Sequence, residues 1–156
     1  MTYQQRKKQY PSKPENCLRC GLFENCKSYK LPYKRLQAGK KCILIVVDNP
    51  SQAYDMTGQM KTSKVWDTMD KAVKEWVADF SVYITHATKC KQKEGTIKIM
   101  SVRQCAPFLQ DDIDKLEPNT IIAVGATAKA ACTELNVDYH YVTDINSNLE
   151  DVLNRT

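Results

Sequence analysis

The chain has 156 residues, a hydrophobic fraction of 42%, and 23 Lys and Arg against 18 Asp and Glu, which suits one compact core and argues against two large domains. No apolar run approaches the roughly 20 residues of a membrane helix, and the N-terminus lacks the apolar stretch of a signal peptide. We therefore expect a cytoplasmic protein that does not contact a membrane.

The basic charge is concentrated in the first quarter of the chain, because residues 1–41 hold 11 Lys and Arg against 2 acids. Residues 1–14 are predicted to form a basic N-terminal arm, followed by a single domain over residues 15–156. Tyrosines alternate with basic residues as far as Lys34 and Arg35, and this composition suits binding to a polyanion such as DNA. A solvated tail is an equally good interpretation of residues 1–13.

Seven cysteines in a chain expected to be cytoplasmic argue against a disulfide framework, because the cytosol keeps thiols reduced. Metal or redox chemistry is the leading explanation. Cys17 and Cys20 form a CxxC motif, and the glycine that follows allows a tight turn around a bound metal. A zinc ribbon needs a second CxxC motif, which the sequence lacks. Cys42 and Cys132 stand among apolar residues and are typical of buried thiols.

Strands and helices are predicted to alternate along the rest of the chain. The apolar patterns predict strands over residues 41–47, 81–88 and 119–125, and helices over residues 62–80, 101–116 and 126–135. The helix over 62–80 would carry an apolar stripe that includes Val77 and Phe80. This order implies a three-layer α/β/α fold with a short, mostly parallel central sheet. Ligands of such sheets bind beyond the carboxyl ends of the strands.

Two segments resemble a known family. YITHATKC (residues 83–90) and CAPFLQDDIDKLEPNTIIAVGATAKAA (residues 105–131) are similar to matching segments of the family four uracil-DNA glycosylases. That family holds a four-iron, four-sulfur cluster on a CxxC motif and two later cysteines. The resemblance therefore implies a uracil-DNA glycosylase fold, DNA as the partner, and cluster ligation by Cys17, Cys20, Cys90 and Cys105. A zinc ion on the same four thiols is the less favoured alternative.

The same resemblance points to catalytic and base-binding residues in VDNPSQAYDMTG (residues 47–58). Asp48 stands where family four has a glutamate, and Asn49 matches an asparagine that positions the attacking water in related families. Cleaving an N-glycosidic bond requires a stabilised sugar cation and an oriented water, so these two are the catalytic candidates. Asp55 matches an acidic position of the motif and is a base-binding candidate. The alternative is a polar turn in which Asp48, Asn49 and Ser51 cap the next helix.

Three departures from the family pattern keep more than one function open. Val47 replaces a glycine that lets the backbone approach the base. His86, the second base-binding candidate, replaces the asparagine that reads the uracil edge, and an imidazole cannot present an adjacent hydrogen-bond donor and acceptor. The family's late histidine motif has no clean counterpart. His140 is a candidate for it, although an ordinary strand residue is the favoured interpretation.

The resemblance therefore implies one of two functions. The first is a divergent glycosylase that excises uracil or a modified pyrimidine from DNA. The second is an inactive accessory that binds DNA and works with a replication or repair protein. DNA contacts are expected at Lys34 and Arg35 and at the helix start around Gly125 and Thr127. The short chain and its missing motifs would suit a phage or another virus.

Overall fold

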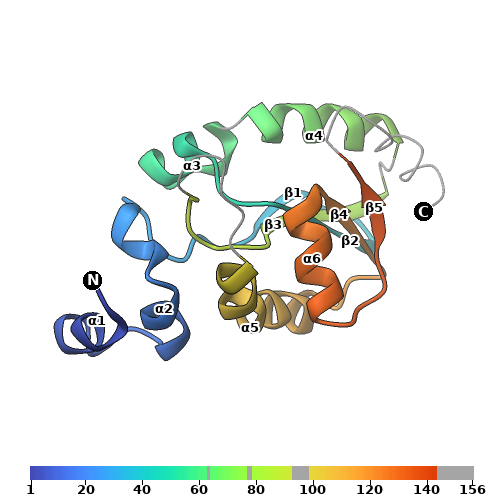
Figure 1. The fold of residues 1–156 in the computed structure, drawn as a ribbon. Helices are drawn as coiled ribbons and strands as arrows, with labels where there is room; N and C mark the ends of the chain where they lie inside the picture. Colours follow the sequence, from blue (N-terminus) through green and yellow to red (C-terminus); the bar gives the residue numbers. More distant parts are fainter. Residues whose placement is uncertain (63, 77–78, 93–98, 144–156) are drawn as a thin grey trace.

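The structure is a computed structural model that describes residues 1–62, 64–76, 79–92 and 99–143 (Figure 1). Its centre is a five-stranded sheet in the order β1-β3-β2-β4-β5. The edge strand β1 runs antiparallel to β3, and all other neighbours are parallel. The strands are β1 (Lys34–Gln37), β2 (Lys41–Val47), β3 (Phe80–His86), β4 (Thr120–Val124) and β5 (His140–Val142).

Helices cover both faces of this sheet, so the predicted three-layer α/β/α fold with a mostly parallel sheet is confirmed. One face carries α3 (Gln52–Thr57) and α4 (Lys64–Trp76), and the other carries α5 (Ile99–Leu116) and α6 (Ala126–Glu134) (Figure 1). To one side lie α1 (Tyr3–Gln9) and α2 (Glu15–Cys20), and two 3-10 helices are η1 (Leu22–Asn25) and η2 (Met60–Thr62). Within the described residues, no helix has the length and apolar character needed to cross a membrane.

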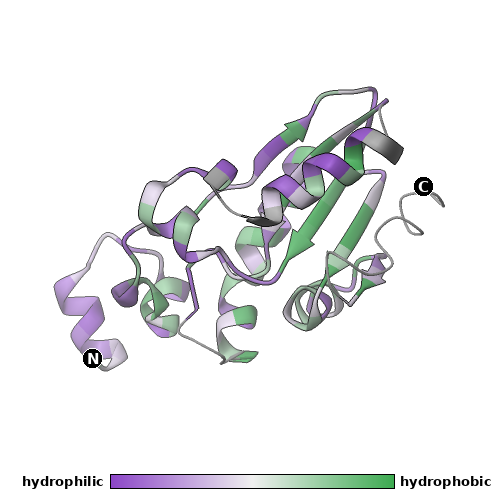
Figure 2. Cartoon of the chain, turned by 90° about the horizontal axis from the view of Figure 1, so that it is seen from above, coloured by the Kyte–Doolittle hydropathy of each residue, from purple (hydrophilic) through white to green (hydrophobic). Residues whose placement is uncertain are grey.

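The central strand β2 divides the core into two layers because its side chains alternate between the faces of the sheet. Ile43 and Ile45 pack in the cluster that includes Met69 of α4. Leu44 and Val46 pack on the opposite side in the cluster that includes Leu109 of α5 and Ala128 of α6. Figure 2 shows the apolar colour concentrated on the central strands, whereas α1 is hydrophilic. A strand buried on both faces reads as a continuous apolar run, which is why β2 was predictable.

The predicted elements lie close to the observed ones, with one clear error. The helix expected over residues 62–80 ends at Trp76 as α4. Phe80 instead opens β3, where it pairs in parallel register with Lys41 of β2. Its assignment to the helical stripe was therefore wrong, because pairing with β2 takes precedence over the helical period. Val77, which was assigned to the same stripe, lies outside the described residues.

The first residues form a helix that is fixed to α2. Thr2 and Gln5 form a capping box at the start of α1, which satisfies two backbone donors. Arg6 donates hydrogen bonds to the backbone carbonyls of Leu18 and Arg19 at the end of α2. The negative end of the helix dipole also stabilises a cation at this position. Residues 3–9 are thus helical, with none of them buried, and the choice between a DNA-binding arm and a solvated tail stays a prediction.

Candidate functional site

The three central parallel strands end at the same edge of the sheet. Val47, His86 and Val124 are the last residues of β2, β3 and β4, and they lie side by side in register. Two further hydrogen bonds extend this pairing, because Ala87 donates to Val47 O and Thr88 donates to Asp48 O. The catalytic candidates therefore lie beside His86, at the edge where parallel α/β sheets bind their ligands.

Asp48 is held against the start of α6. Its Oδ1 accepts a hydrogen bond from the backbone N–H of Ala128 at 2.9 Å, and a carboxylate at this position is favoured by the positive end of the helix dipole. Gly125 makes the approach possible, since it has a φ of 98° and a Cβ there would lie 2.5 Å from Asp48 Oδ1. One carboxylate oxygen thus positions Asp48, and Oδ2 accepts no hydrogen bond from the described residues.

Asn49 and Ser51 form a local turn after β2. The Asn49 amide donates to Pro50 O at 3.2 Å, and its Oδ1 accepts no hydrogen bond within the part of the chain that the structure describes. Ser51 caps α3 by accepting a hydrogen bond from the backbone of Tyr54 at 3.1 Å. The capping interpretation is therefore confirmed for Ser51, whereas the half-buried Asn49 keeps an unused acceptor.

Asp55 braces the chain around the N-terminal cysteines. It is 1% exposed, and its two oxygens accept hydrogen bonds from the backbone of Lys27 at 3.1 Å and of Ser28 at 2.9 Å. Lys91 adds an ion pair at 3.7 Å. The carboxylate thus joins α3 to the segments that follow Cys26 and Cys90. Its predicted role in base binding stays a prediction, and the observed contacts are structural.

His86 is a neutral histidine at the end of β3. It is 4% exposed, and its ring centroid lies 5.7 Å from that of Tyr54. Burial, aided by the nearby Lys89 cation, lowers the pKa of His86 to about 3. Its buried Nδ1 has no hydrogen-bond partner among the described residues, and a buried polar atom of this kind costs about 1–3 kcal/mol when unpaired. A ligand could satisfy this nitrogen.

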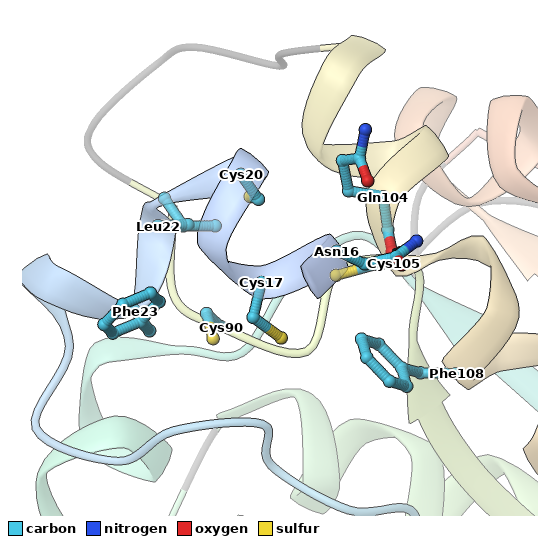
Figure 3. A pocket seen from close by; sticks show the side chains of 9 residues that line it. All are labelled: Asn16, Cys17, Cys20, Leu22, Phe23, Cys90, Gln104, Cys105 and Phe108. Carbon is cyan, nitrogen blue, oxygen red and sulfur yellow. Dashed lines mark hydrogen bonds between the residues drawn. The ribbon is translucent and has the colours of Figure 1, made fainter. Parts of the chain in front are cut away.

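The four cysteines singled out in the sequence line one pocket (Figure 3). Cys17 and Cys20 come from α2, Cys90 from the loop after β3, and Cys105 from α5. The Asn16 amide donates to Gln104 O at 3.2 Å, which joins α2 to α5. Segments far apart in sequence thus bring four thiols together.

The pocket offers sulfur donors in an apolar setting. Leu22, Phe23 and Phe108 contribute to its walls, and four thiols are the ligand set that iron–sulfur clusters or zinc take. Burial raises the pKa of Cys17, and that of Cys105 to about 11. Within the described residues, no three His, Cys, Asp or Glu side chains are arranged to hold a metal ion. The donor chemistry fits a metal centre, and ligation by these thiols stays a prediction.

Two features beside this pocket were not predicted. Cys26 lies against Cys90, and hydrogen bonding between the two thiols raises the pKa of Cys90. Lys89 is buried with an exposure of 3%, and its ammonium donates to Asp112 and Thr85. Burial lowers the pKa of Lys89, and Asp112 opposes that shift. In the sequence, only the position of Lys89 between a predicted strand and Cys90 signals this ion pair.

The predicted DNA contacts fall into two groups. Lys34 and Arg35 are exposed on β1. Gly125 donates its backbone N–H to Val142 O in β5 at 2.9 Å, and Thr127 is only 2% exposed. Lys34 and Arg35 are thus open to a ligand, whereas the side chain of Thr127 is covered. His140 lies in β5, as the strand interpretation predicted.

Comparison with known proteins places this fold in a family. Residues 34–153 match the Uracil DNA glycosylase superfamily, and the search of curated proteins gave no match. Cys90 and Cys105 lie inside the matched region, while Cys17 and Cys20 precede it. Because the match covers well over half of the chain, the protein belongs to the uracil-DNA glycosylase superfamily.

Proposed function

We propose that this protein is a DNA glycosylase that removes uracil or a modified pyrimidine by hydrolysing the N-glycosidic bond. Its family membership supports glycosylase-like chemistry in general. The observation that carries the proposal is the grouping of Asp48, Asn49 and His86 at the carboxyl edge of the sheet. These residues bring a carboxylate, an amide acceptor and a neutral imidazole to the same edge of the sheet.

Each of these groups matches a need of the reaction. Breaking the bond leaves positive charge on the sugar, which a carboxylate stabilises, and a water must be oriented to attack it. Asp48 is held by Ala128 through one oxygen, which leaves the other for the sugar or the water. The unused Oδ1 of Asn49 can accept a hydrogen bond from that water. His86 provides one hydrogen bond to the edge of the base.

The second part of the proposal is a four-iron, four-sulfur cluster on Cys17, Cys20, Cys90 and Cys105. The shared pocket of these thiols supports it, as does the resemblance of their spacing to the iron–sulfur family. When bound, the cluster would tie α2 to α5 and to the loop after β3. Zinc on the same thiols is the alternative, and iron analysis with visible spectroscopy of anaerobically purified protein separates the two.

DNA binding without base removal is the second candidate function. The observation that favours it is the use of Asp48 Oδ1 as a brace for α6, together with Val47 and His86 in place of family residues. An accessory role in replication or repair would keep the fold for holding DNA or a protein partner.

The experiment that tests the proposal compares base release by wild type, Asn49→Ala and Ser51→Ala. Under single-turnover conditions, Asn49→Ala should slow release by about a hundredfold or more, because it loses water orientation. Its DNA affinity should stay near that of the wild type. Ser51→Ala removes only a helix cap and should keep most of the activity. Equal rates for wild type and Asn49→Ala would remove Asn49 from the mechanism.

A further inference from the structure

A groove lies along the flank of the candidate site, between β1 and the chain that follows α3. It is lined by Lys34, Arg35, Gly58, Gln59, Met60, Lys61 and Trp66, and it holds about 550 Å³ of empty space, partly open to solvent. Met60 and Trp66 are nearly buried, with exposures of 4% and 9%. The groove thus has an apolar floor and a cationic rim.

The charge of this groove is unbalanced. Lys34, Arg35 and Lys61 are all exposed, and within the described residues none of them has a carboxylate partner in an ion pair. Among the described residues that line the groove, none is acidic. Three unpaired cations around one concave surface attract an anion with several charges.

The groove is also adjacent to the candidate catalytic residues. Its first wall begins at Gly58, which caps the carboxyl end of α3, and two residues separate Asn49 from the start of that helix. Its second wall includes Lys34, which pairs with Ile84 only two residues before His86. A strand that placed one base beside His86 would therefore carry its neighbouring phosphates past this groove.

We infer that this groove binds the phosphate backbone of the DNA strand that carries the target base. The inference rests on the proposed function and adds Lys61 as a contact. Each lysine or arginine that neutralises a phosphate releases counterions, so binding should weaken with salt in proportion to the number of such contacts. The contacts carry no base selectivity, and they would position the strand while the site acts on the base.

The test measures DNA affinity against salt concentration for the full chain and two triple variants. The groove variant is Lys34→Gln, Arg35→Gln and Lys61→Gln. The control removes the same charge from exposed residues outside the groove, with Lys40→Gln and Lys41→Gln at the start of β2 and Lys115→Gln near the end of α5. Fluorescence anisotropy is recorded with single-stranded and duplex oligonucleotides, and thermal unfolding checks that both variants fold.

For the groove variant, the slope of log affinity against log salt should fall by about 2 on single-stranded DNA and by about 3 on duplex, with about 0.7 or 0.9 lost per contact. The control should keep most of the wild-type slope. The single variant Lys61→Gln should lose about one contact, which tests the groove with a smaller change.

Two outcomes overturn the inference and leave the proposed function standing. They are a wild-type slope in the groove variant, and an equal loss of slope in both triple variants. A wild type that does not bind DNA at low salt would overturn the proposed function as well, so the two failures can be told apart.

Discussion

Protonation of His86 should make the fold sensitive to acid. The side chain is buried and neutral, with its pKa lowered to about 3 from an ordinary 6.5. Below about pH 6.5 the unfolded chain binds a proton at this residue, whereas the folded chain does not until the pH approaches 3. Because the unfolded state then holds more protons, stability falls as the pH falls through this window.

The size of the effect follows from the two pKa values. Protonation of a histidine with an ordinary pKa stabilises the unfolded state by about 2 kcal/mol at about pH 5 relative to neutral pH. This follows because each pH unit below that pKa is worth about 1.4 kcal/mol. His86→Gln removes this term, because glutamine does not titrate. Between about pH 7.5 and pH 5, the variant should therefore lose about 2 kcal/mol less stability than the wild type.

Urea unfolding followed by circular dichroism at both pH values measures this difference. Any constant cost of the substitution cancels, since each protein is compared with itself at the two pH values. The remaining ionisable groups are the same in both proteins, so their contributions cancel in the same way. Identical losses of stability for wild type and His86→Gln would refute the argument that His86 is held neutral by burial.

Three further substitutions test other parts of the structure. Gly125→Ala should destabilise the protein by about 1–3 kcal/mol in urea unfolding, because its φ is positive and its Cβ would meet Asp48. Gly58→Ala should cost less, because Gly58 has a φ of 70° but nothing lies within 4 Å of its Cβ. An equal cost for the two variants would contradict the role of the contact with Asp48. Asp112→Ala should lower the free energy of unfolding by about 3–5 kcal/mol, because it leaves the buried Lys89 without its carboxylate partner. Asp70→Ala removes an exposed ion pair with Lys74, which is worth only about 0.3–0.5 kcal/mol. Similar losses of stability in the two variants would argue against the buried pair. Cys105→Ser should abolish visible absorbance and bound iron in anaerobically purified protein. Cys42 lies outside the pocket, so Cys42→Ser should keep both. Iron retained by Cys105→Ser would remove Cys105 from the proposed ligand set.

Local sequence signals were enough to predict the central strands and the helices beside them. The runs that form β2 and β4 are apolar on both faces, and such runs are typical of central strands of a parallel sheet that is covered on both faces. The edge strand β1 was missed because KRLQ is short and polar, as edge strands often are. Helix α1 could have been found, since Thr2 and Gln5 show the spacing of a capping box.

The candidate site was predictable only where local motifs or the family resemblance reached. The cysteine spacing singled out four residues that do line one pocket. The contacts of Asp55 could not be anticipated, because Lys27 and Ser28 lie far from it in sequence and only the tertiary fold brings them together. The same holds for Cys26 beside Cys90. Burial of His86 likewise depends on its neighbours in three dimensions.

The central claim is that the residues at the carboxyl edge of the sheet remove a base from DNA. The most direct measurement incubates excess wild-type protein, purified anaerobically, with matched single-stranded and duplex oligonucleotides that contain thymine, uracil or hydroxymethyluracil. Alkali-labile abasic sites in the uracil or hydroxymethyluracil strand, with little from thymine, are the predicted result. Binding of all these oligonucleotides without any abasic product would contradict the claim and leave a DNA-binding protein with a glycosylase fold.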